Sequence, residues 1–134
     1  MNKKRIKTQT KIDRDLKSKP HLGLIYHQNY LLHEHSPTHP ERKERLMYTL
    51  DQLKEEGIFS FPNIEVIEPK KSSREELELV HTEKYLDKLE TKSKKGKETA
   101  IDKEKETILQ EPTYEQAKLA AAGAIKASEV VLED

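Results

Sequence analysis

The sequence predicts an α/β fold built on a parallel pair of strands. LGLIY at 22–26 is a short apolar run bounded by polar residues and fits a buried strand, and IEVIEP at 64–69 has the pattern of a second strand. A helical pattern with Pro40 in its first turn and Gly57 as its stop lies between them. Because a strand, a helix and a strand in this order form a right-handed unit, we expect the two strands to pair in parallel.

The helix between the strands is expected from residue 40 to about residue 56. Its apolar residues recur at helical spacing: Leu46, Met47, Leu50 and Leu53. Arg45 stands beside this apolar stripe. A charge in that place needs a partner or a polar channel, unless its stem lies along the core edge with the guanidinium in water.

Capping residues predict three further helices. Ser73 and Glu76 have the spacing of a capping box, and Thr82 is expected to cap a short helix that follows. Thr113 and Gln116 have the same spacing and open the last helix. The polar Lys/Glu stretch between residues 91 and 105 is expected to be a surface loop.

The last helix carries a face of small residues, which lets another backbone approach closely. Its members are Ala117, Ala120, Ala121, Ala122, Gly123 and Ala124. No other segment of the sequence is an evident partner for this face. We therefore expect it to pack against something that the chain does not itself contain.

The composition predicts one domain with a thin core. Of 134 residues, 33% are hydrophobic and 37% are charged, so apolar surface is scarce. The absence of cysteine excludes disulfides, thiolate metal sites and cysteine nucleophiles. No apolar run approaches the roughly 18 residues of a membrane span, and the N-terminus lacks the apolar core of a signal peptide. We expect a cytoplasmic protein without a membrane partner.

The positive charge is concentrated at the N-terminus. Residues 1–20 hold eight Lys or Arg against Asp13 and Asp15, a surplus of six that the rest of the chain balances. With no sustained apolar periodicity, this segment is expected to be a flexible extension ahead of a domain at 21–134. It could contact nucleic acid or an acidic partner, although a solvated tail is the simpler interpretation.

Five of the six histidines fall within nineteen residues: His21, His27, His33, His35 and His39. Imidazole suits Zn, Ni or Cu, so the last three could bind a metal. Against this, the segment lies between a strand and a helix, has no evident supporting shell, and no other ligand cluster stands elsewhere in the sequence. The prediction is that the chain binds no metal by itself.

No self-contained catalytic motif is present. The sequence has no phosphate-binding glycine loop, no nucleophile elbow and no H-E-x-x-H. SPTHPERKERL, at 36–46, is explained by local chemistry as a helix start, since Pro followed by Glu is ordinary in a first turn.

Three segments, in order, resemble the N-terminal part of the histone deacetylase superfamily, which includes acetoin-utilisation proteins and acetylpolyamine amidohydrolases. LGLIYHQNYLLHEHSPTHPERKERL, at 22–46, is similar to the family's first strand, its first active-site loop with H-P-E-x-x-x-R-L, and the following helix. SSREELELVHTEKYLDKL, at 72–89, resembles the A-T-x-E-E-L-x-x-V-H-S-x-E-Y-L segment. ETILQEPTYEQAKLAAAGAIKASEVVL, at 106–132, resembles the stretch that ends in A-A-G-G-A-I.

The resemblance implies part of an arginase/deacetylase-type three-layer fold, with a mainly parallel sheet between helices. It also implies hydrolysis of the amide of an acetylated lysine or polyamine by a single zinc ion. On this resemblance, His39 and Pro40 belong to the loop that walls the substrate pocket, and Arg45 lines the channel through which acetate leaves. Glu106 matches an aspartate at the substrate rim and is one methylene longer.

The family's R-P-P-G-H-H histidine pair, its Asp-x-His and Asp zinc ligands and its tyrosine are absent from the sequence. We therefore expect no catalytic residue, no bound zinc and no activity in this chain alone, with a complementing C-terminal polypeptide as the implied partner. One alternative is a non-enzymatic protein that binds nucleic acid or an acidic partner through residues 1–20. Another is a metal-binding protein built on the histidine-rich loop.

Overall fold

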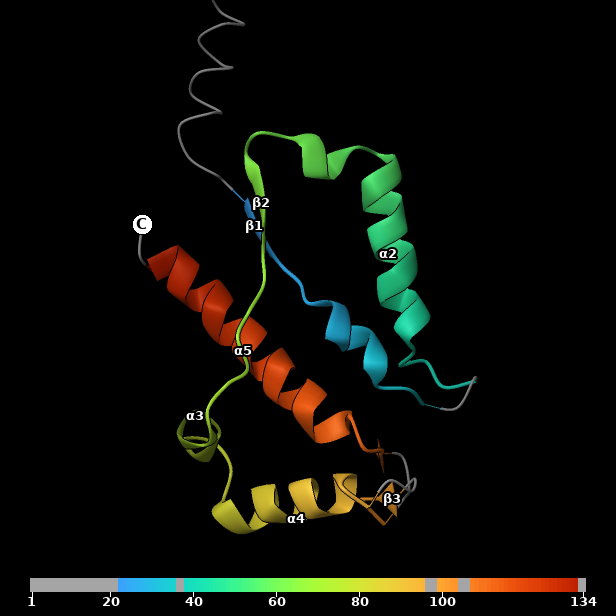
Figure 1. The fold of residues 1–134 in the computed structure, drawn as a ribbon, viewed down its shortest axis with the longest axis vertical. Helices are drawn as coiled ribbons and strands as arrows, with labels where there is room; N and C mark the ends of the chain where they lie inside the picture. Colours follow the sequence, from blue (N-terminus) through green and yellow to red (C-terminus); the bar gives the residue numbers. More distant parts are fainter. Residues whose placement is uncertain (1–21, 36–37, 96–98, 104–106, 133–134) are drawn as a thin grey trace, which may run out of the picture.

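The computed structural model describes residues 22–35, 38–95, 99–103 and 107–132. The basic extension predicted at residues 1–20, with its proposed nucleic-acid contact, lies outside these residues. Figure 1 shows a long C-terminal helix running diagonally through the molecule, with the other elements arranged along it. No helix within the described ranges is both long and apolar enough to cross a membrane.

The two predicted strands form and pair in parallel. Strand β1 (Leu22–Ile25) lies beside β2 (Ile64–Ile67), with Leu22 opposite Ile64 and Ile25 opposite Ile67. The backbone N–H of Tyr26 extends the ladder by donating to the carbonyl of Ile67 at 3.1 Å. The strand, helix, strand order of the sequence thus gives the expected parallel pair.

The helix between the strands is α2 (Lys43–Glu55), which begins three residues later than predicted. Pro40 is not in its first turn, because the N-cap Arg42 is extended (φ −130°, ψ 149°) and the N–H of Glu41 donates to His39 Nδ1 at 3.0 Å. The helix ends as predicted, at Gly57, whose φ of 68° lies in the left-handed region that favours glycine. Short 3₁₀ turns flank it, η1 (Gln28–Leu32) before and η2 (Ile58–Ser60) after.

Capping residues place the next two helices, α3 (Arg74–Glu78) and α4 (Glu83–Ser93). Ser73 and Glu76 form the predicted capping box, with the Ser73 hydroxyl accepting from the N–H of Glu76 at 3.2 Å. The Thr82 hydroxyl accepts from the N–H of Tyr85, also as predicted. Helix α3 is shorter than expected.

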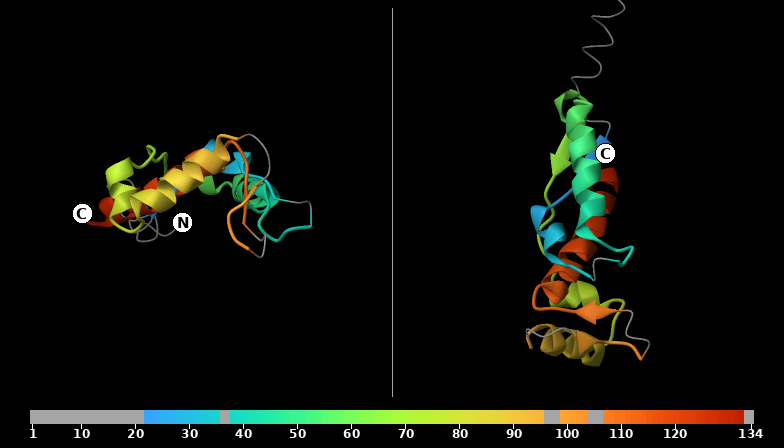
Figure 2. Two further views of the ribbon diagram at one scale, coloured as in Figure 1. Left: turned by 90° about the horizontal axis from the view of Figure 1, so that it is seen from below. Right: turned by 90° about the vertical axis from the view of Figure 1, so that its right-hand side faces the viewer.

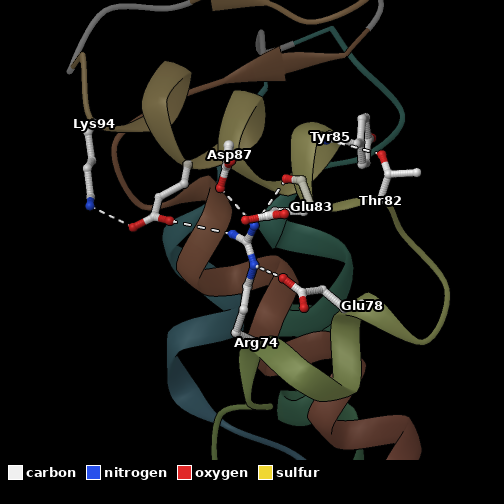
Figure 3. A network of polar contacts seen from close by, with 8 residues as sticks. Arg74, Glu78, Thr82, Glu83, Tyr85, Asp87 and Lys94 are labelled. Carbon is white, nitrogen blue, oxygen red and sulfur yellow. Dashed lines mark hydrogen bonds and ion pairs between the residues drawn. The ribbon is translucent and has the colours of Figure 1, made fainter.

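Arg74 joins α3 to α4 (Figure 3). Its guanidinium donates to Glu78 at 2.6 Å within its own helix, and to Asp87 and the backbone carbonyl of Glu83 in α4 at 2.7 and 3.0 Å. These hydrogen bonds, to Glu78 first and Asp87 second, raise the pKa of Arg74. One charged side chain therefore links the two short helices by hydrogen bonds.

The loop predicted for residues 91–105 is partly regular. Helix α4 continues to Ser93, and β3 (Thr99–Ala100) pairs antiparallel with β4 (Ile108–Leu109). Lys92 donates to the carbonyl of Ala100 at 2.8 Å, which holds the hairpin against the helix. The loop prediction was wrong in these places because strands of two residues are too short to show a period.

The last helix, α5 (Thr113–Leu132), is present, but the predicted capping box at its start is not. The Thr113 hydroxyl accepts from the N–H of Gln110 at 2.9 Å, while the N–H of Gln116 donates to the carbonyl of Pro112. Helix α4 lies across the N-terminal end of α5, and the β1–β2 pair lies toward the opposite end of the molecule (Figure 2).

The small-residue face of α5 has a partner within the chain, contrary to the prediction. Tyr30 of η1 donates its hydroxyl to the carbonyl of Leu119 at 3.1 Å, and a Cβ on Gly123 would lie 2.5 Å from that hydroxyl oxygen. Ala120 and Ala117, about one and two turns earlier than Gly123, remain exposed. The face is therefore covered at Gly123 and open toward the N-terminal end of α5.

The predicted thin core is confirmed for the described residues. The hydrophobic side chains buried among them are Leu86, Leu109, Tyr114, Leu119 and Ala122. They come from α4, β4 and α5, so the best packed part of the molecule lies where these three elements meet. The parallel strand pair contributes none of them.

Candidate functional site

The candidate site lies where the segment between η1 and α2 meets the start of α5. His33 connects the two, because its Nδ1 lies 3.0 Å from the Thr113 hydroxyl, 80 residues away in the sequence. Its Nε2 lies 2.9 Å from Nε2 of His35, so one of these nitrogens donates and the other accepts. A hydrogen-bonded chain thus runs from α5 into the loop.

Burial lowers the pKa of His33, and the neighbouring His35 lowers it further. Both effects disfavour the imidazolium form, the first by removing water and the second by placing another potential cation nearby. A neutral His33 is also what a chain of ring nitrogens requires, since each neutral ring offers one donor and one acceptor.

Beyond His35 the loop gathers two more potential ligands. The rings of His35 and His39 stack with centroids 4.1 Å apart and planes 19° apart. The Glu41 carboxylate lies 3.5 Å from His35 Nε2, and the Glu41 N–H donates to His39 Nδ1. One ligand atom from each of His35, His39 and Glu41 lies within 4.8 Å of the others.

A cavity of about 550 Å³ adjoins this loop. Ile25, Leu46, Ala117 and Ala120 give it apolar walls, and the polar groups at its surface include His33, Glu41 and Gln116. An open, mostly apolar hollow with a few polar groups at one end is the usual form of a small-molecule site.

Two polar groups beside the cavity are partly or fully withdrawn from water. Burial raises the pKa of Tyr30, whose hydroxyl is held by the carbonyl of Leu119. Gln116 is 8% exposed, and its Oε1 has no hydrogen-bond partner among the described residues. A buried acceptor without a donor is costly.

The residues predicted from the sequence are only partly brought together. His39 is half-buried against His35, while Pro40 is exposed. Arg45 is exposed on α2 and borders a smaller cavity of about 130 Å³ that Tyr30 and His33 also line. Glu106 lies outside the described residues.

Sequence reasoning missed Tyr30, Thr113 and Gln116 as site residues. Thr113 and Gln116 have the spacing of a capping box, and helix capping alone is enough to explain why these residue types stand there. The sequence therefore offered no reason to expect that both also line the cavity. Tyr30 stands among ordinary loop residues, and its place opposite Gly123 depends on how η1 meets α5. None of the three has a local signal that points to a site.

Comparison with known proteins gives a consistent set of relatives. The sequence model of the Histone deacetylase domain matches residues 39–134. A "Probable deacetylase" of Archaeoglobus fulgidus is 50% identical over 110 residues, which cover 82% of this chain and 30% of that protein. The acetoin utilization protein AcuC of Bacillus subtilis is 37% identical over 60 residues, 45% of this chain and 14% of that one.

A solved structure agrees with the sequence relatives. The crystal structure of the HDA15 HD domain superposes with a TM-score of 0.66 at 25% identity, covering 76% of this chain and 29% of that one. The expected mixed fold with a parallel sheet is thereby confirmed as one of deacetylase-domain type. The chain spans about 30% of the length of the first of these curated relatives.

Proposed function

Since the chain belongs to the histone deacetylase family, we propose that it forms the N-terminal part of a zinc-dependent deacetylase that hydrolyses the amide of an acetylated lysine or polyamine. The observation that carries this proposal is the placement of the H-P-E-x-x-x-R-L segment, at 39–46. Its loop and the first turns of α2 border a mostly apolar cavity of about 550 Å³.

The residues present do not fit the family's catalytic zinc. That site takes an Asp-x-His and an Asp that follow the R-P-P-G-H-H motif, and none of these patterns occurs in the 134 residues. Within the described ranges, the group of three possible ligands is His35, His39 and Glu41, which lies in the loop before α2. No hydrolytic step is therefore assigned to residues of this chain, and we propose that these 134 residues alone do not deacetylate.

The proposed contribution of the chain is to bind and position. His39 and Pro40 are proposed to belong to the loop that walls the substrate pocket, although the member of this segment that lines the cavity beside them is Glu41. The exposed Ala117 and Ala120 leave room for further parts of the domain to pack on α5. Gln116, which borders the cavity, is proposed to contact the substrate amide and to help position it.

Arg45 is proposed to bind the acetate that deacetylation releases. Arg45 is exposed on α2 and is one of the residues that line the smaller cavity of about 130 Å³. A planar guanidinium matches a carboxylate with two parallel hydrogen bonds, which makes it suited to acetate.

The test is a graft into the Archaeoglobus fulgidus relative, which is 50% identical over the aligned residues. Residues 22–132 replace the aligned segment, and hydrolysis of acetyl-lysine and acetylputrescine is measured with zinc. The grafted protein is expected to be active and the 134-residue chain inactive. Activity of the chain alone, or a folded graft without activity, would contradict the proposal.

Variants of the graft test the assigned positions. Arg45→Ala is expected to lower kcat with little change in KM, because acetate release follows binding. Tyr48→Ala on the same helix is the matched control, since its side chain is 67% exposed and borders neither cavity. Equal losses in the two variants would mean that α2 is merely destabilised.

A further inference from the structure

We propose that His35, His39 and Glu41 form a binding site for a divalent transition-metal ion of the zinc or nickel class. Two imidazoles and a carboxylate converge in the loop before α2, with one ligand atom from each within 4.8 Å of the others. The inference concerns metal binding by this loop and does not depend on deacetylation. It reverses the expectation from the sequence, in which the histidines were counted but the convergence with Glu41 was not visible.

The spacing of the His35 and Glu41 donor atoms is close to that of a coordination shell. Two ligands on a tetrahedral zinc, each bonded at about 2.0–2.1 Å, lie about 3.3 Å from each other. The nearest nitrogen and carboxylate oxygen of His35 and Glu41 are 3.5 Å apart. Glu41 is 68% exposed, so its side chain can rotate toward an ion without disturbing the packing.

His35 is the fixed member of the site. Its side chain is only 5% exposed, and its Nε2 lies 2.9 Å from the ring of His33, which in turn contacts the Thr113 hydroxyl. Ligating histidines in proteins usually hydrogen-bond through their second ring nitrogen, which fixes the ring and its tautomer. In His35, however, the Nε2 atom that faces Glu41 is the same atom that lies against His33, so an ion bound at Nε2 would replace the His33 contact, and the ring is held in place by its burial.

His39 is the movable member. Its Nδ1 accepts a hydrogen bond from the N–H of Glu41, and its ring stacks on His35. To bind an ion it must release that N–H or shift its ring proton to Nδ1. The site is therefore not fully formed without the ion, and ion binding reorders the loop directly before α2.

The donor set indicates which ions bind. Imidazole nitrogen with one carboxylate and no thiolate suits Zn²⁺, Ni²⁺ or Cu²⁺, whereas Mg²⁺ and Ca²⁺ require mostly oxygen ligands. The nearby ammonium of Lys43 does not compete for Glu41, because it is paired with Glu34. Three protein ligands leave the remaining positions to water.

The experiment is calorimetric titration of the untagged, EDTA-treated full chain with Zn²⁺, and separately with Ni²⁺ and Mg²⁺. One Zn²⁺ per chain is expected, with no saturable uptake of Mg²⁺. His39→Ala is expected to lower the Zn²⁺ affinity at least about tenfold. His81→Ala, which removes a histidine that contacts Tyr85 at α4, is the matched control and is expected to bind as the wild type does.

Because His35→Ala removes a nearly buried ring, circular dichroism must accompany it, and the half-buried His39 and exposed Glu41 give the decisive variants. Electron paramagnetic resonance of the Cu²⁺ form is expected to show two nitrogen ligands, reduced to one in His39→Ala. The inference is overturned if uptake is not saturable at one ion per chain. It is equally overturned if His39→Ala and Glu41→Gln both bind Zn²⁺ like the wild type, or if His81→Ala loses as much affinity as they do.

Discussion

The hydroxyl of Tyr30 occupies the space that a side chain at position 123 would need. This contact predicts that Gly123→Ala destabilises the wild type but stabilises the protein when Tyr30 is replaced by Phe. A Cβ on Gly123 would lie 2.5 Å from Tyr30 Oη, closer than real Cβ atoms approach. The next nearest atoms, Ile25 Cγ2 at 3.6 Å and Tyr30 Cζ at 3.7 Å, are at ordinary contact distances. The clash therefore comes from one oxygen atom.

The magnitudes follow from two opposing effects. Replacing glycine by alanine inside a helix stabilises by about 1 kcal/mol, while forcing an extra methyl group into a packed site costs about 1–3 kcal/mol. Gly123→Ala should therefore destabilise the wild type by up to about 2 kcal/mol. Tyr30→Phe loses the hydrogen bond to the Leu119 carbonyl, at a cost of about 0.5–1.5 kcal/mol. In that background Gly123→Ala should stabilise by about 1 kcal/mol.

The assay is urea unfolding of the wild type, the two single variants and the double variant, followed by circular dichroism. The cycle should give a coupling energy of about 1–3 kcal/mol between the two positions. Ala124→Gly, at the exposed neighbouring position, measures the helix preference alone and should cost about 1 kcal/mol. If Gly123→Ala changes stability by the same amount in both backgrounds, the hydroxyl of Tyr30 does not lie against Gly123 and the reasoning fails.

Four further predictions concern single positions. Ser73→Ala removes one half of the capping box of α3 and should lower the free energy of unfolding by about 1 kcal/mol in urea. Gly57→Ala meets no atom within 4 Å but forces a side chain to φ 68°, so urea unfolding should show a loss of about 1 kcal/mol or more, and Gly57→Asn a smaller one. The hydrogen bond from Lys71 lowers the pKa of Glu115. The stabilising effect of this hydrogen bond is therefore present above the ordinary carboxyl pKa and is lost as the pH falls through the lowered value. Glu115→Gln should therefore flatten the decline of the melting temperature below about pH 4.5. Arg74→Ala should lower the melting temperature more at 0.01 M than at 1 M salt, and an equal loss at both would exclude a mainly electrostatic role.

Local chemistry was the part of the fold that the sequence predicted well. Ser73 and Thr82 cap their helices because the capping interaction needs only residues three positions apart. The parallel pairing of β1 and β2 was predictable because only a few connections between two such strands are possible. The family resemblance was equally accessible, since it rests on motifs in order rather than on contacts.

The site was harder to predict because its contacts are long-range. Thr113 has the spacing of a helix cap, yet its hydroxyl accepts a hydrogen bond from the N–H of Gln110 and also lies against His33 Nδ1. The contact with His33 depends on how η1 meets α5. Pro40 fits a helix start by composition, but the hydrogen bond from the Glu41 N–H to His39 keeps this segment out of the helix. In both cases a hydrogen bond to a side chain replaces the local hydrogen bond or helical turn that the sequence pattern predicts.

The distribution of apolar surface connects the stability of the chain with its proposed function. Parallel sheets in proteins are normally covered on both faces, and an isolated strand pair is marginal in water. Here Leu22 of β1 and Val66 of β2 are 51% and 45% exposed, and the buried hydrophobic side chains lie at α4, β4 and α5 instead. A polypeptide that supplied the proposed remainder of the domain would cover these strands as well as complete the pocket. The exchange protection of the β1 and β2 amides should therefore rise when such a polypeptide binds, before any chemistry is measured. If a second polypeptide restored activity without slowing amide exchange in β1 and β2, the pocket would be completed by contacts that do not cover the sheet.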